Sequence, residues 1–407
     1  MKCGLLGRSL SHSYSPQIHS KLGSYDYSLI EKEPDELEAF LKSNAFTGLN
    51  VTIPYKKTVI PYLTELSPIA QRLGAVNTIV CRDGKLIGHN TDYFGFHSMV
   101  EQSGLNLSEK KVLVLGSGGA SNTAVAVLEE MGATVVVVSR TGENNYENLH
   151  LHADTAAIVN ATPVGMYPNV GISPVDLNQF PLLEGVLDIV YNPARTKLLL
   201  DAESRGIVAM NGLWMLVAQA KESAQWFTGN SISNDCIQTI HQQLRLQMEN
   251  IILIGMPGSG KSTVGNQLAE KLGKKFADAD ACIVETAGMS IPEIFSTQGE
   301  AGFRAIETQV LSELGKAGGL VIATGGGCVT REENYPHLHQ NGRIFCLDRD
   351  VSALPTDGRP LSQNGALEQM YNIRKPMYHR FADHHINCNG TIHAAVSEIL
   401  HILEETP

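Results

Sequence analysis

The sequence lacks several features, and each absence narrows its function. No stretch approaches the roughly 20 consecutive apolar residues that span a bilayer, so no membrane-spanning segment is expected. Basic residues are outnumbered, with 31 Lys and Arg against 42 Asp and Glu, and the net charge of −11 does not suit a nucleic-acid binder. Charged residues reach only 18% and hydrophobic residues 43%, the balance of a folded globular protein and not of a disordered chain.

Closely spaced cysteines are also missing. The seven cysteines form no Cys-x-x-Cys pair and stand at positions 3, 81, 236, 282, 328, 346 and 388. An odd number of scattered cysteines is typical of reduced thiols, so we expect a cytoplasmic protein with no disulfide and no cysteine metal site. The apolar run within residues 1–13 is too short for a secretory signal peptide, which favours the same compartment.

Two nucleotide-binding patterns divide the chain, whose 407 residues exceed what one hydrophobic core usually serves. Residues 111–116 form an apolar run, 116–121 a glycine turn, 122–131 a helical stretch and 134–139 a second apolar run. This order predicts a strand–turn–helix–strand unit of a dinucleotide-binding sheet. A second strand, loop and helix begin at residue 250.

We therefore expect an α/β protein with three domains. A substrate-binding α/β domain over 1–100, completed by 211–248, precedes a Rossmann-like domain over 101–210. A P-loop α/β domain like those of nucleoside monophosphate kinases takes 249–407. The helix expected at 234–248 runs into the next strand with almost no linker, so we expect little freedom between the two halves.

The second pattern carries a phosphate-binding motif. Residues 255–262, GMPGSGKS, match G-x-x-x-x-G-K-[ST], and a chance match in a chain this long is expected only about 2 times in 100. Loop N–H groups surround the phosphates of ATP, Lys261 reaches the β- and γ-phosphates, and the Ser262 hydroxyl binds Mg²⁺. A glycine turn with a surface lysine is the alternative. The residues expected at ATP are Gly258, Ser259, Gly260, Lys261, Ser262 and Thr263.

Carboxylates, arginines and glycines beyond the P-loop suggest where a phosphoryl acceptor binds. Asp278 and Asp280 follow a predicted strand two residues apart, so one could hold Mg²⁺ through water while the other meets an acceptor hydroxyl. Arg304 lies in a helical stretch, three glycines at 325–327 end a strand, and Arg374 comes later. Singly, Asp278 could equally cap a helix, and Arg304 could pair with a neighbouring glutamate.

The glycine turn after the first apolar run predicts a dinucleotide site, formed by Gly116, Ser117, Gly118, Gly119, Ala120 and Ser121. The next strand ends in Ser139, Arg140 and Thr141, where NAD binders usually have an acidic residue. A guanidinium and hydroxyls suit a 2′-phosphate, so NADP(H) is favoured, with a surface turn as the alternative. Few residues separate 141 from 160; measured against the family that residues 1–245 resemble (below), which usually has a further helix and strand here, the adenine side of this domain is expected to be trimmed.

Four short polar motifs mark the N-terminal region: HSYSP, NVTIPYK, AVNT and NTD. Alone, Lys56 would be a solvated lysine and Asp92 a helix cap, but their joint occurrence indicates a substrate site. A helix is predicted over 59–66 between these motifs. The candidate residues of the motifs are Ser13, Ser15, Asn50, Thr52, Lys56, Asn77 and Asp92.

Residues 250–390 resemble the shikimate kinase family. The resemblance implies that Asp278 lies near Mg²⁺, and that Asp280 binds shikimate and orients the attacking hydroxyl, acting in catalysis with Lys261. It also implies that Arg359, in a mobile lid, contacts ATP. Arginines suit a carboxylate such as shikimate. The further shikimate-binding residues implied are Arg304, Gly325, Gly326, Gly327 and Arg374.

Residues 1–245 resemble the shikimate dehydrogenase family. The resemblance implies that Lys56 is the principal acid–base group and Asp92 its partner. The motif GLWMLVAQA at 212–220 supplies Gln219, and the stretches 160–166 and 188–193 resemble loops near the nicotinamide. The shikimate-binding residues implied are Ser13, Ser15, Asn50, Thr52, Asn77 and Gln219.

The two resemblances reinforce each other because the product of the first reaction is the substrate of the second. The expected conversion is 3-dehydroshikimate with NADPH to shikimate, then with ATP and Mg²⁺ to shikimate 3-phosphate. Two alternatives stay open: a quinate-using dehydrogenase fused to a related small-molecule kinase, or one half serving as a non-catalytic binding module. An oligomer is possible, and no nucleic acid or membrane partner is expected.

Overall fold

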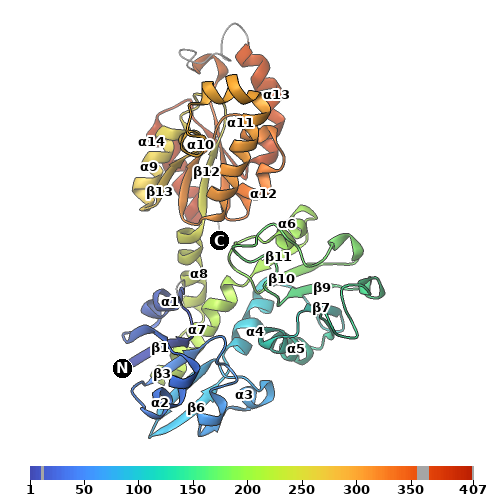
Figure 1. The fold of residues 1–407 in the computed structure, drawn as a ribbon, viewed down its shortest axis with the longest axis vertical. Helices are drawn as coiled ribbons and strands as arrows, with labels where there is room; N and C mark the ends of the chain where they lie inside the picture. Colours follow the sequence, from blue (N-terminus) through green and yellow to red (C-terminus); the bar gives the residue numbers. More distant parts are fainter. Residues whose placement is uncertain (11–12, 355–365, 406–407) are drawn as a thin grey trace. The chain divides into compact units, whose positions relative to one another are not determined.

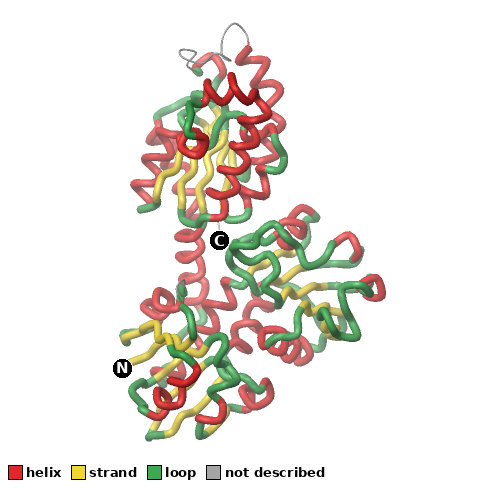
Figure 2. Tube along the Cα trace, viewed as in Figure 1, coloured by secondary structure: helices red, strands yellow, loops and turns green. Residues whose placement is uncertain are grey.

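The computed structural model describes residues 1–10, 13–354 and 366–405 (Figure 1). The chain separates into two compact units. The first holds residues 1–166, 172–191 and 198–243, and the second holds 167–171, 192–197 and 244–407. Sheets with helices against them form both units, which confirms the α/β class expected from the sequence (Figure 2).

The first sheet of unit one is mixed, with the order β2-β1-β3-β5-β6-β4. Strand β1 is parallel to β2 and β3, whereas β5 is antiparallel to both β3 and β6. The strands are β1 Lys2–Gly7, β2 Asp26–Glu31, β3 Gly48–Val51, β4 Glu65–Leu66, β5 Thr78–Arg82 and β6 Lys85–His89.

The helix expected over 59–66 is wrong. The segment contains a 3₁₀ turn at Ile60–Tyr62 and then strand β4. Glu65 and Leu66 pair in parallel with Ile87 and Gly88 of β6. These two residues are therefore in a strand, where the expected helix would have had its second turn. Tertiary pairing has overridden a weak local preference here.

Helices of unit one pack against its sheets. Helix α7 lies against β3, where a Cβ on Gly48 would come within 2.2 Å of the Phe227 ring. The helices that begin before residue 244 are α1 Ser15–Leu22, α2 Leu37–Lys42, α3 Pro68–Leu73, α4 Asp92–Ser103, α5 Gly119–Glu130, α6 Lys197–Ser204, α7 Leu213–Thr228 and α8 Asp235–Met248.

The second sheet of unit one is fully parallel, with the order β11-β10-β9-β7-β8. Its strands are β7 Lys111–Leu115, β8 Thr134–Val138, β9 Ala157–Asn160, β10 Gly185–Asp188 and β11 Val208–Asn211. Between β8 and β9 the chain forms only a 3₁₀ turn at Leu149–His152, so β8 is an edge strand. The expected trimming of this domain after residue 141 is confirmed.

Unit two is built on a parallel sheet with the order β13-β14-β12-β15-β16. Apolar side chains of α9 and α14 cover one face, and those of α10 to α13 cover the other. Its strands are β12 Asn250–Ile254, β13 Lys275–Asp278, β14 Leu320–Ala323, β15 Gly342–Asp348 and β16 His384–Asn387. Its helices are α9 Lys261–Leu272, α10 Ala279–Ala287, α11 Ile291–Lys316, α12 Asn334–His339, α13 Ala366–Phe381 and α14 Ile392–Glu405.

The described part of the chain has no helix that is both long and apolar enough to cross a membrane. All seven cysteines carry free thiols. Three of them, Cys3, Cys328 and Cys346, are buried, and burial raises the pKa of the Cys3 thiol to about 11 and that of Cys328 to about 12. Such thiols stay protonated at neutral pH and pack as small apolar side chains.

Candidate functional sites

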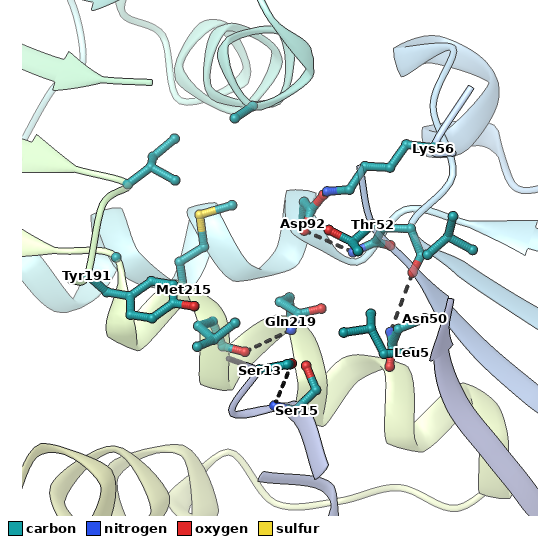
Figure 3. Close-up of a pocket in the computed structure, with 16 residues that line it drawn as sticks. Leu5, Ser13, Ser15, Asn50, Thr52, Lys56, Asp92, Tyr191, Met215 and Gln219 are labelled. Atoms are coloured by element: carbon teal, nitrogen blue, oxygen red, sulfur yellow. Dashed lines mark hydrogen bonds and ion pairs between the residues drawn. The ribbon is translucent and has the colours of Figure 1, made fainter. Parts of the chain in front are cut away.

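A pocket of about 250 Å³ opens in unit one (Figure 3). Polar side chains from the N-terminal motifs and from α7 line it, together with Ala120 in the first turn of α5. The sequence-predicted residues found in its lining are Ser13, Ser15, Asn50, Thr52, Lys56, Asn77, Asp92 and Gln219. The structure therefore brings together in one cavity every residue that the sequence assigned to this substrate site.

An ion pair occupies one side of the pocket. Lys56 Nζ lies 2.6 Å from Asp92 Oδ2, and the two side chains keep 31% and 16% of their exposure (Figure 3). Asn77 Nδ2 donates to the other carboxylate oxygen at 2.9 Å, while Asn77 Oδ1 accepts the backbone N–H of Thr91 at 2.7 Å. Both carboxylate oxygens thus have a fixed donor, so the ammonium group is held at a defined place in the cavity.

Strand pairing explains why these motifs meet. In the antiparallel ladder of β3 and β5, Asn50 stands opposite Thr78. In the next ladder, Thr78 stands opposite His89, directly before the turn that leads into α4. Asp92 is the first residue of α4, where the helix dipole favours a carboxylate. Residues separated by about 40 positions in sequence therefore share one sheet edge.

The opposite side of the pocket comes from α1 and α7. Ser15, the first residue of α1, donates its backbone N–H to Ser13 Oγ at 3.2 Å. Gln219 of α7 donates from Nε2 to the Leu216 carbonyl at 2.9 Å, and its Oε1 lies 3.5 Å from Thr91 Oγ1. These hydroxyl and amide groups are suited to bind a polyhydroxylated ligand.

The glycine turn between β7 and α5 follows the expected pattern. Gly116 has φ of 112°, and a Cβ there would lie 3.1 Å from the Ala161 carbonyl oxygen, so a side chain is excluded. A Cβ on Gly118 or Gly119 would meet no atom within 4 Å, which leaves the face of the turn open to a ligand. Ala120 lines the pocket, and Ser117 is exposed.

Ser121 does not present its side chain to a cofactor. The residue is fully buried, and its hydroxyl donates to the Gly116 carbonyl at 2.7 Å. The place of Ser121 at the cofactor stays a prediction, and its hydroxyl is already used to close the turn. Only the backbone N–H of Ser121, at the start of α5, remains suited to a phosphate.

The end of β8 carries the residues expected at the adenosine ribose. Ser139 is half-buried, whereas Arg140 and Thr141 are exposed. The Arg140 guanidinium stands close enough to Tyr146 to oppose the rise that burial produces in the pKa of the tyrosine. A cationic side chain thus stands at this edge of the sheet, where a 2′-phosphate would need one.

The P-loop of unit two joins β12 to α9. Its glycines 255, 258 and 260 have φ of 139°, 86° and 99°, conformations that L side chains rarely adopt. Lys261 Nζ donates to the carbonyl oxygens of Gly255 at 2.9 Å and Met256 at 3.0 Å. The lysine is folded over its own loop, and Ser259 within the loop is buried.

Asp278 accepts hydrogen bonds from two different partners. Its Oδ2 accepts from the Ser262 hydroxyl at 2.7 Å, and its Oδ1 accepts the backbone N–H of Asp280 at 3.0 Å. It therefore caps α10, as the simpler interpretation of the sequence held, and also pairs with the serine expected at Mg²⁺. A hydroxyl and a carboxylate beside a P-loop form a suitable donor set for that hard cation.

Three glycines lie against the acceptor-side carboxylate and arginines. A Cβ on Gly325 would lie 2.8 Å from Asp280 Oδ1, and one on Gly327 would lie 2.3 Å from Arg304 Nη2. Arg374 Nη1 donates to the Gly326 carbonyl at 3.1 Å. All the acceptor-site residues expected from the sequence thus meet at this glycine run. Burial and the nearby Asp278 raise the pKa of Asp280, against the lowering effect of Lys261 and Arg304.

Glu307 belongs to the same group, although it was expected from the sequence only as a possible partner of Arg304. Arg304 Nη1 lies 2.6 Å from Glu307 Oε2, a carboxyl that is only 1% exposed and whose pKa burial raises. The pairing of Arg304 with a neighbouring glutamate, which the sequence left open, is therefore present together with the contact to Gly327. The spacing of three residues in a helix was the available signal.

Other residues in or near these sites fall outside the sequence-based expectations. Tyr191 and Met215 line the unit-one pocket; the stretches 188–193 and 212–220 that contain them had been marked in the sequence, but neither residue had been assigned a role. Cys346, Asp348 and His385 have ligand atoms within 4.8 Å of one another, and hydrogen bonds inside the group join them. Arg359 lies outside the described residues.

Comparison with known proteins matches both parts of the chain. The family model for the shikimate dehydrogenase substrate binding domain matches residues 5–79, and the model for shikimate kinase matches residues 257–404. A shikimate dehydrogenase (NADP(+)) of Clostridium perfringens is 35% identical over 264 residues, which cover 60% of this chain and 97% of that protein.

Solved structures resemble the same N-terminal part. Shikimate dehydrogenase 1 from Peptoclostridium difficile is 38% identical, with a TM-score of 0.55 over 60% of this chain and 98% of that one. A quinate dehydrogenase from Corynebacterium glutamicum in complex with NAD is 28% identical, with a TM-score of 0.55 over 60% of this chain and 98% of that one.

Proposed function

Because the chain belongs to the shikimate dehydrogenase family and carries a shikimate kinase domain, we propose that it catalyses two consecutive reactions. The first reduces 3-dehydroshikimate to shikimate with NADPH, and the second transfers a phosphoryl group from ATP to shikimate. The Lys56–Asp92 pair inside a small polar pocket is the observation that carries the first reaction. The P-loop beside Asp280 and two arginines carries the second.

In the reduction, Lys56 is the proton donor to the substrate oxygen. Bound NADPH would supply the hydride, and the oxygen of the reduced carbonyl would then need a proton. Lys56 Nζ carries one, and Asp92 at 2.6 Å holds the ammonium group in position. Ser13, Ser15 and Gln219, on the opposite side of the cavity, would bind the substrate polar groups and fix the ring for reaction.

The NADP(H) site would use the turn after β7 and the end of β8. Gly118 and Gly119 leave space for a pyrophosphate against the N-terminus of α5. Arg140, with Ser139 and Thr141 on either side, would hold the 2′-phosphate. NADP(H) fits these residues because the glycine turn leaves space for its pyrophosphate and Arg140 offers a positive charge to its 2′-phosphate.

In the phosphoryl transfer, Lys261 would leave its loop carbonyls for the ATP phosphates, and Ser262 with Asp278 would hold Mg²⁺. Asp280 would accept the proton of the attacking shikimate hydroxyl. Arg304 and Arg374 would bind the shikimate carboxylate, since guanidinium groups form paired hydrogen bonds with carboxylates. The bare backbone of the glycine run would let the ring lie close to all three side chains.

Two single variants of the intact chain test whether each half catalyses its own reaction. Lys56→Ala should abolish NADPH oxidation with 3-dehydroshikimate but leave ADP formation from added shikimate unchanged. Lys261→Ala should do the reverse. Each half then serves as the folding control for the other, and loss of both activities in either variant would contradict the proposal. Wild-type protein that binds its ligands without turnover in one half would make that half a binding module.

Quinate is the substrate that competes most directly with shikimate, because it is also a ring carboxylate. The proposal expects dehydrogenase oxidation of shikimate to exceed that of quinate when both are offered at equal concentration with NADP⁺. The solved quinate dehydrogenase contains NAD, so the same assay should be run with NAD⁺. A preference for quinate with NAD⁺ would replace the proposed substrate and cofactor together.

A further inference from the structure

Three buried hydroxyl groups lie in contact directly behind the pocket of unit one. The Oγ atoms of Thr78, Thr91 and Ser223 are 2.9 to 3.2 Å apart, and the three residues are at most 1% exposed. Thr78 and Thr91 come from the sheet and the turn before α4, whereas Ser223 comes from α7. A cluster of hydroxyls in a core costs free energy unless each is hydrogen-bonded.

Ser223 connects this cluster with the pocket lining. Asn50 Nδ2 donates to Ser223 Oγ at 2.7 Å, and Ser223 Oγ donates to the Gln219 carbonyl at 2.9 Å. Asn50 and Gln219 both line the pocket. Thr91, which also contacts Ser223, bonds to Asn77, the residue that holds Asp92. Ser223 therefore touches three of the elements that carry substrate-site residues, without lining the pocket itself.

The donors and acceptors of this network permit few arrangements. Asn50 Oδ1 accepts from the Tyr27 hydroxyl at 2.8 Å, so its amide nitrogen must face Ser223 and Thr78. A hydroxyl has one proton and two acceptor sites. With its proton on the Gln219 carbonyl, Ser223 accepts from Asn50 and keeps one acceptor site, which either Thr78 or Thr91 can fill because both hydroxyls lie 2.9 Å away. Alanine in this position would leave the Asn50 amide without its shortest acceptor.

We propose that Ser223 is a positioning residue for the dehydrogenase reaction, which fixes the Asn50 amide and the Gln219-bearing turn of α7 for substrate binding. This inference rests on the proposed reduction of 3-dehydroshikimate. Ser223 reaches the Lys56–Asp92 pair only indirectly, through the hydroxyl of Thr78 or Thr91 and then Asn77, so its main effect is on substrate binding and its smaller effect is on the chemical step. Buried polar networks of this kind specify one arrangement of the groups that they join.

The test is Ser223→Ala in the full chain. KM for 3-dehydroshikimate should rise about tenfold, because a buried amide donor loses its shortest acceptor and keeps only those at 3.2 and 3.4 Å. kcat should fall by less than about threefold, and KM for NADPH should not change. The kinase rate with added shikimate, measured on the same preparation, reports folding of the rest of the chain.

Thr228→Ala is the matched control. Thr228 lies on the same helix and its hydroxyl donates to the Ala224 carbonyl at 2.9 Å, the same four-residue spacing as Ser223 to Gln219. It is not among the pocket-lining residues. This variant should keep the wild-type KM. If both variants raise KM equally, or neither does, Ser223 has no positioning role.

A second substitution keeps the inference testable if Ser223→Ala does not fold. Ser223→Cys keeps the shape of the side chain with a slightly larger atom and offers only a weak acceptor, so its KM should lie between those of the wild type and Ser223→Ala. A cysteine variant that folds and matches Ser223→Ala in stability but the wild type in KM would overturn the inference. A wild-type protein that fails to reduce 3-dehydroshikimate would instead refute the proposed function, so the two failures are distinguishable.

Discussion

The Lys56–Asp92 pair allows a quantitative prediction for Asp92→Asn. Two unit charges 2.6 Å apart interact by about 1.6 kcal/mol in water and about 6 kcal/mol at an effective dielectric constant of 20. Because the Lys56 side chain keeps 31% of its exposure, solvent screening lowers the interaction free energy of the pair to about 2–3 kcal/mol. The new amide would also face either Lys56 or Asn77 with a donor instead of an acceptor. We expect kcat/KM for 3-dehydroshikimate to fall about 30- to 150-fold.

The assay is NADPH oxidation at pH 7, followed across a range of 3-dehydroshikimate concentrations. Asp154→Asn is a matched control, because Asp154 also pairs with a lysine, Lys111, at 2.6 Å but is 60% exposed and outside the pocket. The loss of the Asp154–Lys111 ion pair should leave the dehydrogenase kinetics unchanged. An Asp92→Asn enzyme within threefold of the wild type would refute the role given to the ion pair.

Three further predictions concern the cofactor edge and the kinase site. Arg140→Ala should raise KM for NADPH at least tenfold and leave KM for NADH unchanged, because only NADPH has a 2′-phosphate; equal effects on both cofactors in initial-rate assays would contradict this. Gly327→Ala should lower the kinase rate at least 100-fold with the dehydrogenase rate intact, because the added Cβ would lie 2.3 Å from Arg304 Nη2 and would displace that guanidinium from the proposed carboxylate site. Burial raises the pKa of Asp280, so its reactive carboxylate form is lost at a higher pH than the ordinary value of about 3.9. The acid limb of the kinase pH–rate profile should therefore lie above that value, and a limb at or below it would remove Asp280 as the base.

Much of the fold follows from local patterns in the sequence. The βαβ unit and the P-loop are predictable because a buried parallel strand, a glycine turn and a helix each leave a distinct pattern. The trimmed segment after Thr141 is also visible, since too few residues remain for another helix and strand. The helix prediction for residues 59–66 failed because the pairing of this segment with β6 is a contact that no local sequence pattern reveals.

The sites were predictable to the extent that their residues stand in motifs. Asn50, Asn77 and Asp92 lie in motifs at strand ends, and the ladders of β5 then bring them together. Contacts made across the fold leave no such pattern. Ser223 meets Asn50 across 173 residues, and no motif marks it.

Side-chain geometry also decided some questions that the sequence had left open. Asp278 caps a helix and pairs with Ser262 at the same time, because its two oxygens point to different partners. Ser121 stands in the glycine motif but uses its hydroxyl inside the turn. Residue identity alone cannot distinguish such cases, since a hydroxyl or carboxylate fits either partner equally well.

A single reaction mixture tests the bifunctional assignment most directly. Wild-type protein is combined with 3-dehydroshikimate, NADPH, ATP and Mg²⁺, and nicotinamide absorbance and ADP are followed together. One ADP should form for each NADPH oxidised, after a lag while shikimate accumulates, and no ADP should form when NADPH is omitted. NADPH oxidation without ADP, or ADP release without NADPH, would contradict the assignment of two consecutive reactions to this chain.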